Sequence, residues 1–188
     1  ALTIDQTTVA SGGTLDITNG NLTILNGVGS DLTINGTFNW SNAASTMTVN
    51  TGAVVDGSTN FSYHGTNLIN NGYMNLYTVV GGSTPVTITG TGSIAILLPF
   101  TFNAAGIIIN GTQTITNQIS FNYGIIHAIG TSKIIIANGA SIFNGTTDKY
   151  IDGNLEYYFA YPLGLTYNIG DATGYYPIQF TPLITNNG

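Results

Sequence analysis

The feature that most constrains the fold is a short strand followed by Asn-Gly, which occurs twice within Asn21–Gly36. Leu22–Ile24 and Asp31–Ile34 are the two strands, and each runs into an Asn-Gly pair. Strand alternation places the leucine and isoleucine on one face and the threonine between them on the other. Asn and Gly tolerate positive φ, so the chain can turn sharply there. The phrase recurs with variations along most of the chain, which predicts an all-β protein of many short strands.

Glycine follows the strong strands at irregular intervals, and each interval holds more than one strand. The glycines concerned are Gly36, Gly52, Gly72, Gly90, Gly111 and Gly139. No long window shows apolar residues at helical spacing. An irregular repeat of short strands predicts a right-handed parallel β-solenoid, in which each coil stacks its inward residues on those of the next. The alternative is an antiparallel β-sandwich, whose strands are usually longer and spaced more steadily, about 8–12 residues apart.

The composition changes near Asp148, beyond which tyrosine and proline become frequent. We therefore predict a solenoid over residues 1–147 and a C-terminal β cap or small β-unit over residues 148–188. A solenoid needs its terminal coils closed, because an open end exposes both the core and unpaired strand edges.

Charged residues make up only 5% of the chain, and Lys133 and Lys149 are its only cations apart from histidine. Useful affinity for a nucleic-acid backbone takes about six to ten phosphate contacts. Two lysines cannot supply them, so we expect no nucleic-acid partner and no binding to anionic membranes. No apolar run is long enough to predict insertion into a membrane as a helix. The cysteine-free, Asn- and Thr-rich composition indicates a secreted or cell-surface protein.

Two phrases near the C-terminus carry a family resemblance. Tyr150–Leu155 reads YIDGNL, and Tyr167–Ile178 reads YNIGDATGYYPI. They resemble the pattern Y-V-x-G-x-L followed by F-P-I-G-D-x-x-x-Y-R-P-V in large secreted surface proteins of the Bacteroidetes, which carry Thr/Asn/Gly-rich β-helical repeats upstream. Tyr176 stands where arginine is usual, and Asn168 where proline is usual. The resemblance implies an exported surface adhesin or structural layer.

Three apolar triplets, Ile96–Leu98, Ile107–Ile109 and Ile134–Ile136, break the alternation of inward and outward residues. Their central residues should point away from the core, so this outer face needs cover. Either an internal layer of the chain or a neighbouring copy can supply it. Terminal strands could add to a neighbour's sheet by strand pairing. The predicted contact residues are Leu97, Ile108, Ile135, Leu2, Ile4, Leu183 and Ile184.

Our leading hypothesis is an extracellular structural or adhesive protein that self-assembles as a fibre or surface-layer subunit and is not an enzyme. The first alternative is a carbohydrate-binding adhesin module, because aromatic rings stack on sugar faces and tyrosine adds a hydroxyl group. The candidate residues for glycan contact are Tyr157, Tyr158, Tyr175 and Tyr176. These tyrosines could instead pack the cap.

Residues that could bind a metal or carry catalysis are sparse. Polysaccharide-active solenoids need paired carboxylates, and the chain has no Asp-Asp or Asp-x-Asp pair. Asp148, Asp152 and Glu156 form its one acidic cluster, at a spacing that would place them on one face of a strand. They are a candidate calcium site, with a solvated polar edge as the other interpretation. His64 and His127 have no partners at zinc-ligand spacing, and we expect no other cofactor.

Two Thr-Ile-Thr segments, Thr87–Thr89 and Thr114–Thr116, place pairs of threonines outward. Some β-solenoids bind ice through flat arrays of such pairs, which then occur in nearly every coil. Most coils here carry Leu-Thr-Ile, with one outward threonine. Ice binding is therefore a further alternative, beside a polysaccharide-active β-helix.

Overall fold

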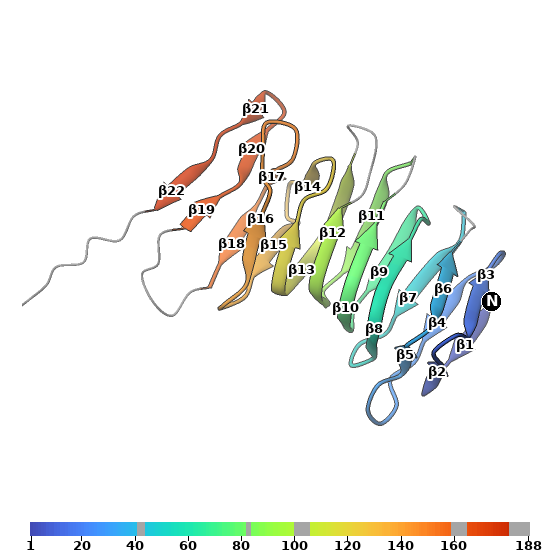
Figure 1. Cartoon of the computed structure of the whole chain (residues 1–188). Coiled ribbons are helices and arrows are strands. Elements are labelled where there is room, and N and C mark those ends of the chain that lie inside the picture. Colours follow the sequence, from blue (N-terminus) through green and yellow to red (C-terminus); the bar gives the residue numbers. More distant parts are fainter. Residues whose placement is uncertain (41–43, 82–83, 100–105, 159–164, 181–188) are drawn as a thin grey trace, which may run out of the picture.

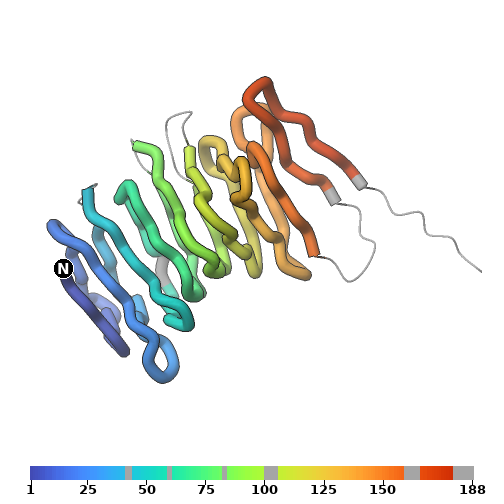
Figure 2. The backbone as a smooth tube through the Cα atoms, turned by 180° about the vertical axis from the view of Figure 1, so that it is seen from behind, coloured from blue at the N-terminus to red at the C-terminus, as the bar shows by residue number. Residues whose placement is uncertain are grey.

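The computed structural model describes residues 1–40, 44–81, 84–99, 106–158 and 165–180, and every regular element in them is a β-strand. The chain winds about seven times around one axis, and its coils stack in chain order (Figures 1 and 2). Neighbouring coils pair through parallel strands. The molecule is thus a parallel β-solenoid, as predicted, and not an antiparallel sandwich. In the described part of the chain, no helix is long and apolar enough to cross a membrane.

Three faces, here named A, B and C, run along the rod. Face A comprises β1 (Leu2–Ile4), β4 (Leu22–Ile24), β7 (Thr46–Val49), β9 (Asn67–Asn70), β11 (Val86–Gly90), the start of β13 (Ile107–Ser120), β14 (Ile126–Ala128), β17 (Ile151–Gly153) and β20 (Ile169–Asp171). Face B comprises β2 (Thr7–Val9), β5 (Leu32–Ile34), the first parts of β8 (Val54–Tyr63), β10 (Tyr73–Val80) and β12 (Ser93–Pro99), the middle of β13, β15 (Lys133–Ile136) and β18 (Leu155–Tyr157). Face C comprises β3 (Thr14–Ile17), β6 (Thr37–Trp40), the later parts of β8, β10, β12 and β13, and β16 (Ser141–Phe143).

Inward-facing residues of successive coils stack in register and form the core. On face A this column is aliphatic throughout, and its central members are fully or almost fully buried. They are Leu22, Met47, Leu68, Ile88 and Ile109. Each such side chain stabilises the fold by about 1.5–3 kcal/mol relative to leaving it in water. The Leu-Thr-Ile phrase therefore folds as its alternation predicts, with the threonine outward.

Inside face C, the core changes from aliphatic to aromatic side chains. Phe38 and Phe61 have ring centroids 4.9 Å apart, and Trp40 and Tyr63 have centroids 5.0 Å apart. The Tyr63 hydroxyl donates hydrogen bonds to the carbonyl oxygens of residues 45 and 67. Burial raises the pKa of Tyr63 to about 12, so the phenol stays protonated and keeps donating. This aromatic cluster supports the second and third coils from within.

One polar contact crosses the core at the corner between faces A and B. Asn70 Nδ2 donates to Gln113 Oε1 at 2.9 Å, and Gln113 Nε2 donates to the Gly90 carbonyl at 2.9 Å. Both side chains are buried. Burial of an amide is tolerated when it is hydrogen-bonded, and the two amide nitrogens here are, whereas Asn70 Oδ1 has no partner among the described residues. The two hydrogen bonds link three successive coils.

The C-terminal region does not separate from the solenoid at residue 147. β17 pairs in parallel with β14, β18 with β15, and β20 with β17, so the coil pattern continues beyond the predicted boundary. The pairing then becomes antiparallel, between β20 and β21 (Gly174–Tyr175) and between β19 (Leu165–Tyr167) and β22 (Ile178–Phe180). The antiparallel pairs form the expected β cap, which begins later than the composition suggested.

The prediction that Leu97 lies on the outer surface is wrong. Its side chain is only 1% exposed and lies in register with the buried residues Thr78 and Ile119. The register shifts between Ile94 and Ile96, where β12 passes from face B to face C. A shift of one residue moves every following side chain to the opposite face, so the central residue of this triplet points inward.

Candidate functional site

A groove of about 570 Å³ lies on face C, near the N-terminal end of the rod. It is formed where β3, β6 and β8 lie side by side. Along β3 and β6, aromatic and aliphatic residues alternate with polar ones, so the polar side chains point outward. The lining residues are Asp16, Thr18, Phe38, Asn39, Trp40, Ser62 and His64.

Two hydrogen bonds organise the polar wall of this groove. Asn39 Nδ2 donates to Asp16 Oδ1 at 2.6 Å, between residues that are in register on β6 and β3. Ser62 Oγ and His64 Nε2 lie 2.8 Å apart. Carboxylate, amide, hydroxyl and imidazole groups together offer both donors and acceptors. The groove can therefore bind a ligand that is rich in hydroxyl groups.

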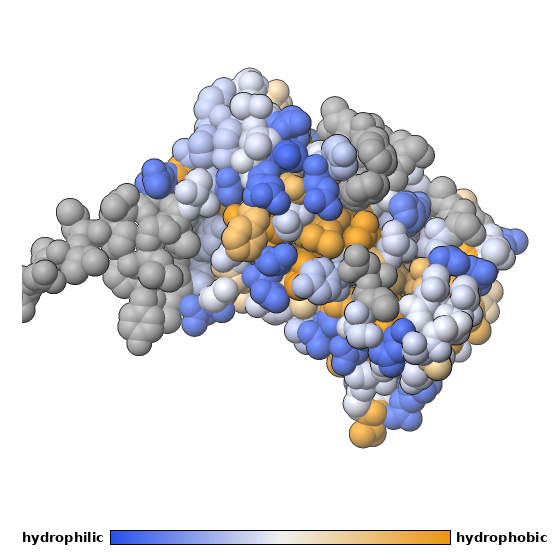
Figure 3. All heavy atoms as spheres, in the orientation of Figure 1, coloured by the Kyte–Doolittle hydropathy of each residue, from blue (hydrophilic) through white to orange (hydrophobic). Residues whose placement is uncertain are grey.

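An apolar strip continues face C toward the middle of the rod. It consists of Tyr77, Val79 and Leu98, which are half-buried or exposed, and Phe143 lies farther along beyond the polar Ser120. Ser62 of the groove is in register with Val79, and Val79 with Leu98, so groove and strip share one outward column. Figure 3 shows apolar side chains gathered over the middle of this face, with hydrophilic residues around them. Tyr77 is 49% exposed and presents the largest ring of the strip.

The charge on this face is low. Asp16 is the acidic residue of the groove, and both lysines of the chain lie elsewhere. Lys133 lies on face B, where its Nζ is 2.7 Å from Glu156 Oε2, and Lys149 lies in the turn before β17. The hydrogen bond from Lys133 lowers the pKa of Glu156. A strongly anionic ligand would find no lysine or arginine here, because the chain holds no others.

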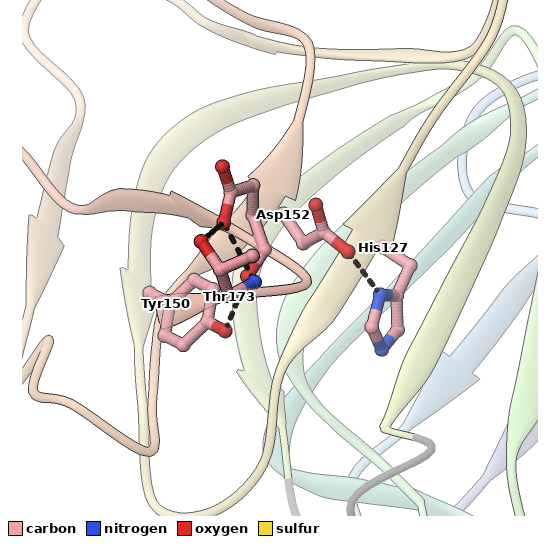
Figure 4. A network of polar contacts seen from close by, with 5 residues as sticks. His127, Tyr150, Asp152 and Thr173 are labelled. Carbon is pink, nitrogen blue, oxygen red and sulfur yellow. Dashed lines mark hydrogen bonds and ion pairs between the residues drawn. The ribbon is translucent and has the colours of Figure 1, made fainter. Parts of the chain in front are cut away.

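A second polar cluster lies where the last coils of face A meet the cap (Figure 4). His127 Nδ1 and Asp152 Oδ2, from adjacent strands β14 and β17, are 2.8 Å apart. The Tyr150 hydroxyl donates to the Asp171 carbonyl oxygen at 2.9 Å, and Thr173 donates twice to the Asp171 carboxylate. Burial, followed by the nearby carboxylates of Asp152 and Asp171, raises the pKa of Tyr150. These contacts fasten the cap to the solenoid.

The predicted calcium ligands are not brought together. The chain turns between β17 and β18, so Asp152 lies on face A and Glu156 on face B. Asp152 pairs with His127, Glu156 with Lys133, and Asp148 accepts a hydrogen bond from Thr146. The expectation of a shared face is therefore wrong. Among the residues that the structure describes, no group of three or more acidic, histidine or cysteine side chains could hold a metal ion.

The tyrosines predicted to bind glycans divide into two groups. Tyr157 packs against the core with its ring 4.5 Å from that of Tyr167, and Tyr175 donates to Asn168 Oδ1 at 2.7 Å. These two serve the cap, as the other interpretation of the tyrosines had it. Tyr158 and Tyr176 are exposed at this end of the rod, away from the groove.

The predicted contact residues are scattered over the molecule. Ile108 lies on the outer side of face A and is 38% exposed, whereas Ile135 on face B is half-buried. In the first coil, Leu2 is exposed and Ile4 is half-buried against the core. Leu183 and Ile184 lie outside the described residues. The structure thus assembles no single surface from this set.

Sequence reasoning missed the groove on face C. Asp16 and Asn39 each stand between two apolar residues, in Leu-Asp-Ile and Phe-Asn-Trp, and this alternation marks both as outward. The register between coils brings them together, and that register depends on coil lengths, which vary along the chain.

No protein-family model, no curated protein and no solved structure matches this chain.

Proposed function

We propose that this chain is an extracellular adhesive module that binds an uncharged glycan along face C. The observation that carries the proposal is the continuity of the groove with the apolar strip. Sugars present hydroxyl groups at their edges and C–H groups on their faces. The groove offers hydrogen-bonding side chains, and Tyr77 offers a ring on which a sugar face can stack. The low charge of the face agrees with a neutral ligand.

The glycan chain would run along the axis of the rod. Asp16, Asn39, Ser62, Val79 and Leu98 follow one another on successive strands, at a spacing of about 4.8 Å per strand. Two strand spacings are comparable to the length of a disaccharide unit. A linear polysaccharide could thus place its hydroxyl groups in the groove and its apolar faces over Tyr77 and the strip.

The Ser62–His64 pair also resembles a nucleophile and its base, an arrangement that needs a third group to orient the histidine. Among the described residues, Asp16 accepts a hydrogen bond from Asn39 and none is recorded between Asp16 and His64. The geometry therefore favours binding over catalysis.

The extracellular setting rests on the composition of the chain and on its resemblance to secreted Bacteroidetes surface proteins.

Replacing Tyr77 by alanine should weaken glycan binding about two- to tenfold, since stacking contributes about 0.5–1.5 kcal/mol. Asn39→Ala should weaken it to a similar degree by removing an amide from the groove wall. Affinity electrophoresis in gels that contain neutral or anionic polysaccharides measures both effects. The matched control is Tyr158→Ala, because Tyr158 is similarly exposed (54%) but lies outside face C. Equal losses in the Tyr77 and Tyr158 variants would contradict this site.

Self-assembly is a second candidate, favoured by two exposed isoleucines beside face A. Ile108 is 38% exposed, and Ile129, just beyond β14 on the adjacent coil, is 62% exposed. Paired copies could bury both side chains. We expect the wild-type protein to associate with rising concentration in sedimentation velocity, and the double variant Ile108→Asp with Ile129→Asp to stay monomeric. A wild-type protein that remains monomeric at every concentration would refute this candidate.

A further inference from the structure

The outer side of face A carries two columns of uncharged residues, here called the hydroxyl array, which are polar except at Ile69. The first column holds Asn21, Thr46, Asn67 and Thr87, and the second holds Thr3, Thr23, Thr48, Ile69 and Thr89. Five coils contribute to it. The sequence suggested isolated threonines, and the register of the strands aligns them.

The array is held on a rigid base. Thr23 and Thr48 lie between buried neighbours such as Leu22 and Met47, and Thr23, Thr48 and Thr89 are themselves half-buried. Threonine is branched at Cβ and has few χ1 rotamers, so its hydroxyl and methyl groups occupy defined positions. Packing against the threonine of the next strand restricts them further.

The columns of the array lack charge over the first five coils. The array contains no ionisable side chain, and His127 of the seventh coil is the first one in its columns. In the same coils, face B carries Asp56 at an outward position. In the last coils both faces are charged, with Asp152 on face A and Glu156 on face B. Over these five coils, the columns of the array hold none of these charges, and such a surface suits an uncharged, ordered ligand.

The geometry of the array is that of a two-dimensional lattice. Neighbouring strands are about 4.8 Å apart, and alternate residues along a strand are about 6.6 Å apart. The spacing between strands is close to the shorter oxygen repeat on the surfaces of hexagonal ice. We propose that the hydroxyl array binds ice, with the threonine hydroxyls holding water in ice-like positions and the methyl groups filling the spaces between. This site lies on a different face from the glycan groove and does not depend on it.

Slow growth of an ice ball in a dilute protein solution tests the proposal. We expect the wild-type protein to be enriched in the ice and an unrelated soluble protein to be excluded. Thr48→Lys, at the centre of the second column, should lower incorporation at least tenfold, because a flexible, hydrated cation interrupts the lattice. Thr114→Lys is the matched control, since Thr114 is a half-buried outward threonine on face B and its replacement should leave incorporation unchanged.

Circular dichroism and thermal melting verify that each variant folds. If Thr48→Lys does not fold, Thr23→Lys replaces it as the array variant. The proposal is overturned if the wild-type protein is excluded from ice, or if the array variants and the face B control are incorporated alike. Binding to crystalline cellulose without incorporation into ice would assign the array to a different lattice and would also overturn it. Glycan affinity of Thr48→Lys should equal that of the wild type, which separates this result from the function of the groove.

Discussion

Truncation of Phe61 to alanine should destabilise the protein by about 3–5 kcal/mol, the range for removal of a buried aromatic side chain. Phe61 is fully buried, and its ring centroid is 4.9 Å from that of Phe38. The side chain belongs to the aromatic cluster behind the groove, where two other rings lie close by. Backbone hydrogen bonds between coils prevent the surroundings from collapsing into the cavity, so most of the cost should persist.

Urea unfolding monitored by tryptophan fluorescence measures this effect, since Trp40 is the single tryptophan and lies within the same cluster. Ser62→Ala is the control, because its side chain is the outward neighbour on the same strand. We expect that variant to unfold within about 0.5 kcal/mol of the wild type. A Phe61→Ala protein as stable as the control would show that the cluster does not support the coils.

Gly111→Ala should cause the second large loss of stability, about 3 kcal/mol or more. Gly111 has φ +127° and pairs with Gly90 of the preceding coil, and a Cβ atom on Gly111 would lie 2.4 Å from the Gly90 carbonyl oxygen. Backbone strain of this kind costs about 1–3 kcal/mol. Overpacking against a neighbouring backbone adds about 1–3 kcal/mol more. The two effects act together, because neither coil can move without breaking its ladder.

Gly139→Ala separates strain from crowding. Gly139 also has positive φ, +85°, but an added Cβ would meet no atom within 4 Å. We expect this variant to lose about 1 kcal/mol through strain alone. Thermal unfolding of both variants by calorimetry gives the difference. Equal losses at the two positions would mean that close approach of the coils contributes nothing at Gly111.

The fold was predictable because its information is local. In Leu-Thr-Ile, the alternation that puts Leu22 inward and Thr23 outward needs no knowledge of the next coil. Longer strands such as β13 were not predicted, because β13 continues through the Asn110-Gly111 pair, which the sequence indicates as a turn. It then bends to face C between Ile115 and Gln118, where the chain has no glycine. Leu97 was misplaced for the same reason, since the register shift in β12 leaves no mark in the residue types.

The candidate site was less accessible to prediction because it depends on relations between coils. Asp16 and Asn39 meet only because β3 and β6 pair in one register, and Ser62 joins them from a third coil. Conversely, Asp152 and Glu156 look close in sequence, yet a corner of the solenoid places them on different faces. The C-terminal region was predicted to bind glycans because it is rich in tyrosine, but two of its four candidate tyrosines pack the cap.

Amide chemical-shift mapping with a neutral oligosaccharide tests the central claim, glycan binding along face C, most directly. We expect saturable shifts at Asn39, Ser62, His64 and Tyr77, with face A unaffected. Shifts confined to Tyr158 and Tyr176 would move the site to the C-terminal end of the rod. The absence of shifts with every neutral oligosaccharide would contradict the proposed function itself.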